Sequence, residues 1–372
     1  MRRLISSKRS WLIILVILAI VAYFAIRVSR NPLDPRLSKA DNEFGFKLLR
    51  EMVRANPDRN LVICPVGLAL TLQLAYNGAT GQTKRDMADA LGLEGLSTAE
   101  IDEANRKLIA MLRNPELGVN VRIVNSIWGG MATQFRTEFL QTNERYYGAK
   151  IGDSGDSKPC GHLYLISDSQ LAGQWMYAFE RTMIDDLPFK YRDGHSSRVT
   201  TLLGYGVFES TMGEYRDASI PEIIRVPYKG ERVSMYIMLT SCAEWPRVID
   251  SHEWERWMSE LRPMVTLVLL PVFSLSSDFD LPLDSMGMSP ESDFSKMYLR
   301  PTPAKGIKHI ARIEVHQEGS RPMPVKHSPL PKHFLANRPF YFFIRDDRTG
   351  LILFMGWVAD PTEGMESSDQ LH

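Results

Sequence analysis

The sequence contains side chains that could perform chemistry, but they do not form a familiar catalytic pattern. No Gly-x-Ser-x-Gly, His-Glu-x-x-His or Gly-x-Gly-x-x-Gly motif occurs among the 372 residues. The eight histidines are dispersed. His309 and His316 lie an odd number of positions apart on a predicted strand, and such residues point to opposite faces. A shared metal ion is therefore disfavoured, and we expect no enzymatic activity, no cofactor and no metal site.

The most informative residues lie between two strongly predicted strand units near the C-terminus. Lys308–Ser320 alternates apolar and polar side chains and reaches a glycine near its end, which predicts a strand. Pro339–Ile344 and Leu351–Val358 are continuous apolar runs joined by an Asp/Gly turn, which indicates a hairpin buried on both faces. Between these units, Ser320–Ala336 contains four prolines and shows no periodicity. A loop of that length in a compact domain is usually functional or disordered.

The rest of the chain predicts helices and short strands around this unit. An amphipathic helix starts at Asp41 and ends before Asn56-Pro57. Pro65 at a first helical position, and Thr83 with Asp86 as a capping pair, mark two further helix starts. The other predicted elements are a strand at Leu61–Ile63, helices at Val66–Tyr76 and Thr83–Leu93, a strand at Ile123–Trp128, a helix at Phe135–Tyr147, a strand at Leu163–Ile166, a hairpin of Ile223–Tyr228 and Val233–Leu239, a helix around Trp254–Leu261, and a buried strand at Thr266–Phe273.

Two separated blocks of the sequence resemble the serpins. Glu318-Gly319-Ser320 is similar to the family's hinge, and Leu335–Phe340 with Leu353–Val358 is similar to its C-terminal signature. At the other end of the chain, Asn60–Pro65 and Leu74–Leu93 are similar to a second family block. The resemblance spans about residues 41 to 361. It implies an α+β, serpin-like fold, with helices packed on a large mixed central β-sheet and smaller C-terminal β-hairpin sheets. It also implies a homologue of serine-type endopeptidase inhibitors, with a serine protease as the partner.

The resemblance implies roles for the loop residues as well. Ser320–Ala336 corresponds to the reactive-centre loop, in which a protease cleaves a bait bond and the freed loop inserts into the main sheet. The residues that it implies as the hinge are Glu318, Gly319, Ser320, Arg321, Pro322 and Pro324. Lys326 is a basic residue suited to a trypsin-like enzyme, and with His327 and Ser328 it marks the expected bait.

The composition of the hinge disfavours insertion. In an inserted strand, Pro322 and Pro324 would face the same neighbouring strand, and each would leave a carbonyl there unpaired. At ~1–3 kcal/mol per buried unsatisfied group, the two prolines cost roughly 2–6 kcal/mol. Ser320–His327 reaches only about 26 Å at ~3.3 Å per residue, which is short for the family. We therefore favour a homologue that has lost insertion, a non-inhibitory binding or scaffold module; an active inhibitor and a plain cleavable substrate are the alternatives.

The expected main sheet departs from the family in its shutter and in its cover. Serpins usually have serines where Cys64 and Gly67 stand and asparagine where Ser167 stands, and a repacked core without a special role is the alternative interpretation. His309 matches the family's strand histidine near the hinge, whose usual role is a structural hydrogen bond. Ile151–Lys158 leads almost directly into the next strand, so the helix that covers the main sheet in serpins is missing. We expect a poorly covered sheet face that invites partner contacts.

The N-terminus predicts a membrane anchor. Basic residues within the first ten precede the uncharged run Trp11–Ile26, and this asymmetry places the N-terminal end in the cytoplasm. We divide the chain into a cytoplasmic N-terminus (1–10), a transmembrane signal-anchor (11–26), a linker (27–40), a serpin-like domain (41–361) and a disordered tail (362–372). The domain is then periplasmic or extracellular. A cleaved signal peptide, which gives a secreted protein, and a misread start are the alternatives.

The overall composition excludes some partner classes. The chain has 44 basic and 44 acidic residues, a balance that favours no nucleic acid or polyanion. Its three scattered cysteines form no disulfide framework. We expect a monomer whose partner is a serine protease or another protein ligand.

Overall fold

The protein is described here from a computed structural model. It describes residues 33–114, 117–129, 133–153, 163–183, 188–211, 220–239, 249–282, 284–289, 291–300, 304–321 and 331–363. The predicted signal-anchor, the hinge prolines Pro322 and Pro324, the bait residues Lys326, His327 and Ser328, and all but two residues of the predicted tail lie outside this part of the chain and stay predictions.

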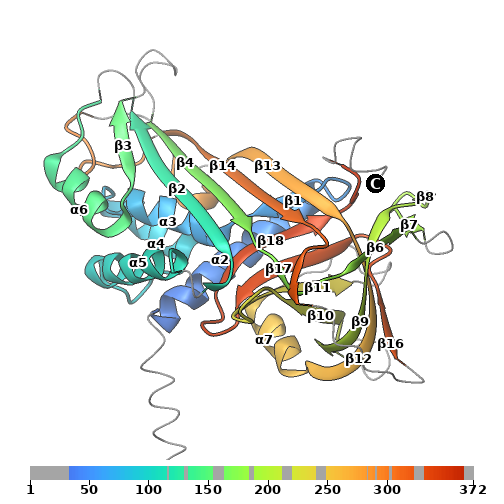
Figure 1. Cartoon of the computed structure of the whole chain (residues 1–372). Coiled ribbons are helices and arrows are strands. Elements are labelled where there is room, and N and C mark those ends of the chain that lie inside the picture. The colour runs from blue at the N-terminus through green and yellow to red at the C-terminus, as the bar shows by residue number, and fades with distance from the viewer. Residues whose placement is uncertain are drawn as a thin grey trace, which may run out of the picture.

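Two large β-sheets form the framework of the molecule (Figure 1). The nine-stranded sheet has the order β1 (Leu61–Ile63), β18 (Ile352–Val358), β17 (Phe340–Asp346), β11 (Val233–Leu239), β10 (Glu222–Pro227), β9 (Thr200–Ser210), β12 (Arg262–Pro271) and β16 (Lys332–Leu335), with β6 (Glu180–Met183) also paired to β9. The five-stranded sheet has the order β13 (Phe273–Leu281), β14 (Ala304–Val315), β4 (Leu163–Ala172), β2 (Asn120–Gly129) and β3 (Lys150–Asp153). Two small sheets pair β15 (Gly319–Arg321) with β5 (Trp175–Tyr177), and β7 (Phe189–Lys190) with β8 (Ser196–Ser197).

Helices pack on these sheets and confirm the predicted α+β class. They are α2 (Pro35–Ala55), α3 (Pro65–Tyr76), α4 (Gly81–Leu91), α5 (Thr98–Leu112), α6 (Thr137–Tyr147) and α7 (Ser251–Ser259), with a short 3-10 helix at Asp284–Met286. Every residue of α3 is buried, and this helix contacts β2 and β4 of one sheet and β18 of the other. The apolar side chains of α3 point in all directions around its axis and do not form one stripe, which suits a helix enclosed between two sheets.

The five-stranded sheet is mixed, with a parallel pair at its centre. β13 pairs antiparallel with β14 and β2 pairs antiparallel with β4, whereas β14 and β4 run parallel. Along β4, the odd-numbered residues from Leu163 to Leu171 are buried, and the even-numbered residues from Tyr164 to Asp168 are partly exposed. One face therefore packs on the protein interior, and the opposite face is only partly covered by the described residues.

The connection between β3 and β4 is short, as the sequence predicted. Nine residues, 154–162, join Asp153 to Leu163, and they lie outside the described residues. The predicted loss of the helix that covers the main sheet in serpins concerns these residues, and it stays a prediction.

The first helix begins earlier than the sequence analysis placed it. α2 starts at Pro35, so residues 35–40 of the predicted linker are helical. Asp34 is the N-cap, and its carboxylate accepts a hydrogen bond from the backbone N–H of Arg36 at 2.9 Å. A proline after an aspartate, as in Asp34-Pro35, can mark either a linker or the start of a helix. In the folded protein it starts the helix, because α2 packs on the rest of the molecule.

The predicted capping pair of the third helix is wrong. α4 begins at Gly81 with Thr80 at the N-cap, so Thr83 and Asp86 both lie inside the helix. The hydroxyl of Thr83 instead accepts a hydrogen bond from the backbone N–H of Asp293 at 2.8 Å. A long-range contact therefore uses the side chain that the local pattern assigned to a cap.

The predicted strand Thr266–Phe273 is in fact parts of two strands. β12 ends at Pro271 in the nine-stranded sheet, and β13 begins at Phe273 in the five-stranded sheet. A continuous apolar run indicates burial but does not specify which sheet each end joins.

The described helices give no membrane span. None of them is both long enough and apolar enough to cross a bilayer, and the predicted anchor at residues 11–26 is not among them.

Candidate functional site: the anchored loop and the closed sheet behind it

The N-terminal end of the predicted loop is tied to strand β5. After β14 ends at Val315, the chain forms β15, which pairs in parallel with β5 at Gly319↔Trp175 and Arg321↔Tyr177. The indole Nε1–H of Trp175 donates to the carbonyl of His316 at 2.6 Å, and its backbone N–H donates to the carbonyl of Glu318 at 3.0 Å. The predicted hinge residues Glu318, Gly319, Ser320 and Arg321 thus lie at or next to the small two-stranded sheet of β15 and β5. They belong to neither of the two large sheets.

Trp175 is a rigid base for this contact. Its side chain is buried and stacks on Tyr228, with ring centroids 4.5 Å apart and planes 16° apart. Phe179 packs edge-on against the same indole, and its backbone N–H donates to the carbonyl of Gln317 at 3.1 Å. Three successive carbonyls, of residues 316, 317 and 318, are therefore held by Trp175 and Phe179.

Gly319 allows the two strands to approach closely. A Cβ atom at this position would lie 2.0 Å from the backbone nitrogen of Ala178 and 2.3 Å from the carbonyl carbon of Tyr177. Both are backbone atoms, so neither can move aside as a flexible side chain could. The close approach of the two strands therefore requires a glycine at position 319. The sequence analysis singled out Gly319 only because it is similar to a residue of the family hinge.

The C-terminal end of the predicted loop is tied to the nine-stranded sheet. Lys332–Leu335 forms β16, which pairs in parallel with β12 from Thr266↔Lys332 to Leu269↔Leu335, and Phe334 is fully buried. The predicted loop Ser320–Ala336 is therefore too long at both ends. The segment between β15 and β16 comprises residues 322–331.

Lys332 fixes β16 through its side chain. Its ammonium group donates to the hydroxyl of Ser210 and to the carbonyl of Thr211, both at 2.6 Å, and lies 3.4 Å from the carboxylate of Glu222. Burial lowers the pKa of Lys332, and Glu222 opposes that shift. The sequence analysis missed this residue because a single lysine in a loop gives no local signal of burial.

In the five-stranded sheet, the two central parallel strands, β14 and β4, are paired along their length. β14 and β4 match from Ala304↔Leu163 to Ile313↔Leu171, with one irregularity near Gly306. The ladder includes His309 opposite Ser167, so two of the four predicted shutter residues lie at its centre.

His309 and Cys64 join this ladder to helix α3. The ring Nε2 of His309 accepts a hydrogen bond from the backbone N–H of Cys64 at 3.0 Å, and the thiol of Cys64 accepts one from the backbone N–H of Gly67 at 3.3 Å. Cys64 is therefore the N-cap of α3. The structural hydrogen bond expected for His309 is present.

Gly67 makes room for hydroxyl groups that come from the strand. A Cβ at Gly67 would lie 2.4 Å from Ser169 Oγ and 3.0 Å from Ser167 Oγ, and both serines are fully buried. The serine side chains at this contact are thus on β4 rather than on the helix. Ser169 was not singled out from the sequence, although it lies two residues after Ser167 and must share its face.

The buried Cys64–His309 pair is not a nucleophilic centre. Burial raises the pKa of the Cys64 thiol to about 12 and lowers the pKa of His309 to about 3, although a backbone hydrogen bond with Ser167 opposes the second shift. Both groups are neutral at pH 7, whereas a nucleophilic cysteine requires a thiolate. His316 follows the last residue of β14 and is exposed, and the described residues contain no group of three or more His, Cys, Asp or Glu that could hold a metal ion.

The fold agrees with the comparisons to known proteins. A family model described as "Serpin (serine protease inhibitor)" matches residues 39–158 and 153–361. The chain belongs to the serpin family. It is homologous to serine protease inhibitors, and the resemblance seen at the two ends of the sequence is confirmed.

Individual serpins share about a quarter of this chain's residues. This serpin is 25% identical to human glia-derived nexin over 402 aligned residues, which cover 95% of this chain and 100% of the relative. It is 24% identical to plasminogen activator inhibitor 1 of Neovison vison over 382 residues, which cover 88% and 94% of the two chains. The solved structure of human thyroxine-binding globulin shares its fold with a TM-score of 0.78 at 20% identity, covering 88% of this serpin and 99% of the globulin.

Proposed function

We propose that this serpin is a membrane-anchored, non-inhibitory protein that binds a protein partner and does not insert its loop into the sheet. The observation that carries the proposal is the position of the prolines. β15 is held on Trp175 and Tyr177 up to Arg321, and Pro322 is the next residue. Any inserted strand must therefore begin with Pro322 and Pro324 near its entry point.

The central ladder sets the energetic requirement for insertion. The strand would have to separate β14 from β4 along the nine residue pairs between Ala304↔Leu163 and Ile313↔Leu171, and then pair with both. Pro322 and Pro324 would present no N–H to one of these neighbours. Two unpaired carbonyls in the centre of a sheet oppose insertion by roughly 2–6 kcal/mol.

The length of the loop supports the proposal less strongly than the prolines do. The parallel ladder has nine residue pairs, and Pro322–His327, the segment between β15 and the expected bait, is six residues long. A loop cleaved at the expected bait could therefore extend along most of this ladder. The proposal therefore rests on the missing N–H groups of Pro322 and Pro324 and not on the length of the loop.

Retained inhibition is the second candidate function, and Lys326 is the feature that favours it. A lysine near the middle of the loop suits a trypsin-like protease, and the relative from Neovison vison is named as an inhibitor of plasminogen activator. In this alternative, Lys326–Ser328 is the bait, Glu318, Gly319 and Ser320 are the hinge, and a serine protease is the partner.

Trypsin distinguishes the two candidates. Wild-type protein mixed with trypsin at equal concentration is expected to be cleaved in the loop without forming a covalent complex on a denaturing gel. A complex of protein and protease that survives denaturation contradicts the proposal. Pro322→Ala/Pro324→Ala tests the cause of the loss, and Pro329→Ala/Pro331→Ala is the matched control because it removes two prolines beyond the expected bait.

The membrane part of the proposal is supported by the sequence of the N-terminus. Trp11–Ile26 contains no charge and follows four basic residues, a pattern typical of a signal-anchor with its N-terminus in the cytoplasm. Extraction of cell membranes with alkaline carbonate tests this directly. The full chain is expected to stay in the membrane pellet, and release into the soluble fraction contradicts the anchor.

A further inference from the structure

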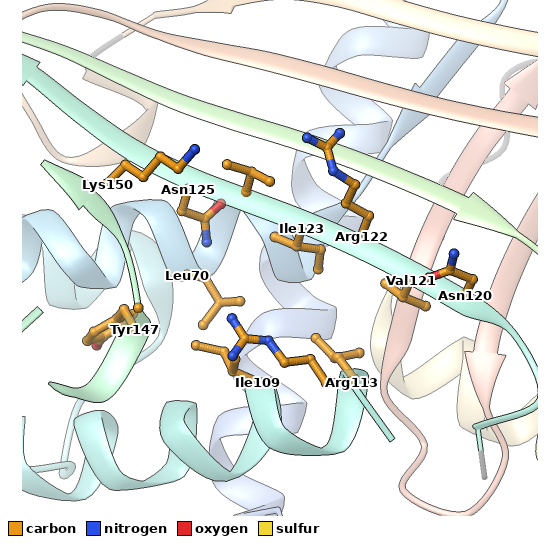
Figure 2. Close-up of a pocket in the computed structure, with 13 residues that line it drawn as sticks. Leu70, Ile109, Arg113, Asn120, Val121, Arg122, Ile123, Asn125, Tyr147 and Lys150 are labelled. Carbon is orange, nitrogen blue, oxygen red and sulfur yellow. The ribbon is translucent and has the colours of Figure 1, made fainter. Parts of the chain in front are cut away.

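A cavity of about 450 Å³ lies between helix α5 and strand β2. Tyr147 and Gly148, at the end of α6 and just after it, line one end of it, and Asn120 on β2 lines the other (Figure 2). The volume falls within the ~300–1,000 Å³ that is typical of small-molecule sites. None of the named lining residues is one of the loop-anchor or shutter residues described above.

The inner wall of the cavity is apolar. Leu70 of α3, Ile109 and Leu112 of α5, and Ile123 of β2 all line it. Figure 2 shows the side chains of Leu70, Ile109 and Ile123 directed into the space between β2 and α5. Such a surface favours a hydrocarbon chain, because burial of each methylene group is favourable by ~0.8 kcal/mol.

The charged residues of the cavity are all basic. Arg113, Arg122 and Lys150 line it, and none of its lining residues is Asp or Glu. Arg122 and Lys150 both point to the other side of β2 (Figure 2), and Arg122 forms an ion pair with Asp168 at 3.6 Å. No ion pair is formed by Arg113 or Lys150 among the described residues. The cavity therefore favours a negative charge and disfavours a cation.

Arg113 is in position to bind that charge. It is the C-cap residue of α5, and its guanidinium group lies beside Leu70 and Ile109 inside the cavity (Figure 2). A guanidinium group presents two parallel N–H donors that match a carboxylate. Arg113 has no acidic partner among the described residues, and it lies next to an apolar wall. This arrangement suits a ligand that has a carboxylate at one end and an apolar chain at the other.

We propose that this cavity binds a carboxylate with a single apolar chain, such as a medium-chain fatty acid. The chain lies against Leu70, Ile109, Leu112 and Ile123, and the carboxylate accepts hydrogen bonds from Arg113. This site is separate from protease recognition, and it does not depend on whether the loop inserts.

Calorimetric titration of the full chain with decanoate tests the site. Decan-1-ol and decyltrimethylammonium have the same chain with a neutral and a positive head group. Decanoate is expected to bind saturably, and about tenfold or more tightly than either analogue, the fold-change that a lost charge-assisted hydrogen bond produces. No saturable binding of decanoate, or equal binding of all three compounds, overturns the proposal.

Two variants and one control locate the binding. Arg113→Gln is expected to weaken decanoate binding about tenfold or more, and Ile123→Phe is expected to abolish it by filling the cavity. Arg106→Gln is the control, because Arg106 lies on the same helix but pairs with Glu103 at 2.6 Å and does not line the cavity. Arg113 is exposed, so its replacement does not disturb the core. Unchanged affinity in Arg113→Gln overturns the proposal and points instead to adsorption elsewhere, such as on the apolar run at residues 11–26.

Discussion

The indole N–H of Trp175 donates to the backbone carbonyl of His316 at 2.6 Å, and this bond fixes the chain where it leaves the five-stranded sheet. Trp175 is itself held by stacking on Tyr228. The start of the loop is thus joined to the interior by a side chain that cannot easily change its orientation.

Trp175→Phe is expected to loosen this end of the loop. The ring can still stack on Tyr228, but the carbonyl of His316 loses its donor, which costs about 1–3 kcal/mol in the free energy of unfolding. Urea denaturation measures the loss, and limited proteolysis measures how readily the loop is cut. Trp357→Phe is the matched control, because Trp357 Nε1 donates to the carbonyl of Pro57 at 2.9 Å far from the loop. If both variants change loop cleavage equally, the anchor assigned to Trp175 is wrong.

Gly319→Ala is expected to separate β15 from β5. The new methyl group would overlap the backbone of Tyr177 and Ala178, so the strands must move apart. Hydrogen exchange at the backbone N–H groups of Trp175 and Phe179 reports the separation, since these groups donate to Glu318 and Gln317. Faster exchange is the expected result.

Gly306→Ala is the control for that variant. Gly306 lies on β14, and a Cβ there meets no atom within 4 Å. Its replacement is expected to leave exchange at Trp175 and Phe179 unchanged. Equal protection in both variants and in the wild type contradicts the packing role of Gly319.

Lys332→Met is expected to destabilise the other end of the loop. The change removes two hydrogen bonds from a largely buried ammonium group and leaves the hydroxyl of Ser210 and the carboxylate of Glu222 without it. We expect a loss of about 1–3 kcal/mol in the free energy of unfolding, measured by urea denaturation. Lys308→Met removes an exposed pair with Asp278, and it is expected to cost at most about 1 kcal/mol. A smaller effect at Lys332 than at Lys308 contradicts the anchor.

Because His309 is buried, we expect the free energy of unfolding to decrease in acid. Burial lowers its pKa to about 3 in the folded protein, from 6.5 for an unperturbed histidine, so the unfolded chain binds more protons between these pH values. Stability is therefore complete above pH ~6.5 and falls as the pH drops toward 3, by up to about 4–5 kcal/mol.

Comparison with His309→Gln isolates this contribution. Burial raises the pKa of Asp41 to about 7, which gives an opposite trend between pH 3.8 and 7. Asp41 is present in both proteins, so its effect cancels in the difference. Urea denaturation at several pH values is expected to show a weaker dependence in the variant below pH ~6.5. Identical slopes would mean that His309 is not the buried neutral group described above.

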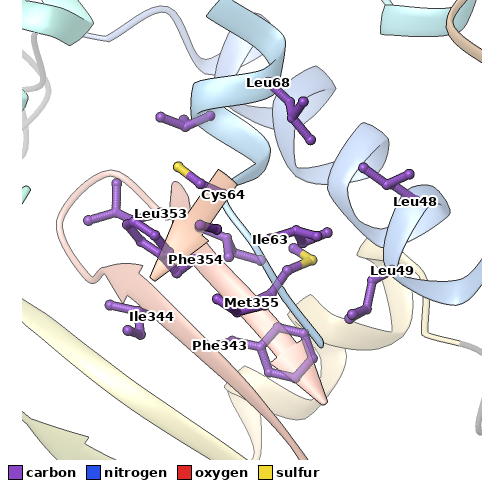
Figure 3. Close-up of a cluster of buried hydrophobic side chains, with 14 of the residues drawn as sticks. Leu48, Leu49, Ile63, Cys64, Leu68, Phe343, Ile344, Leu353, Phe354 and Met355 are labelled. Atoms are coloured by element: carbon purple, nitrogen blue, oxygen red, sulfur yellow. The ribbon is translucent and has the colours of Figure 1, made fainter. Parts of the chain in front are cut away.

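The parts of the fold that follow from continuous apolar runs could be predicted from sequence. The C-terminal hairpin is an example: Phe343, Ile344, Leu353, Phe354 and Met355 are all fully buried, and they pack near Ile63 and Leu48 (Figure 3). A short continuous apolar run is typical of a strand that is buried on both faces, so the sequence of the run alone predicts its burial.

Other features depend on partners that are distant in sequence. The switch of sheets at Val272 is not visible in an apolar run, and the burial of Lys332 depends on Ser210, Thr211 and Glu222. Helix α5 differs, because its capping box of Ser97 and Glu100 is a local signal that the sequence analysis did not use.

The most direct test of the account is the thermal unfolding of the full chain before and after trypsin nicks the loop once, as verified by mass spectrometry. If Pro322 and Pro324 prevent insertion, the melting temperature should rise by no more than ~2 °C, the change that about 1 kcal/mol produces in a domain of roughly 320 residues. A much larger rise would show that the cleaved loop joins β4 and β14 as a new strand, and it would contradict the proposed loss of insertion.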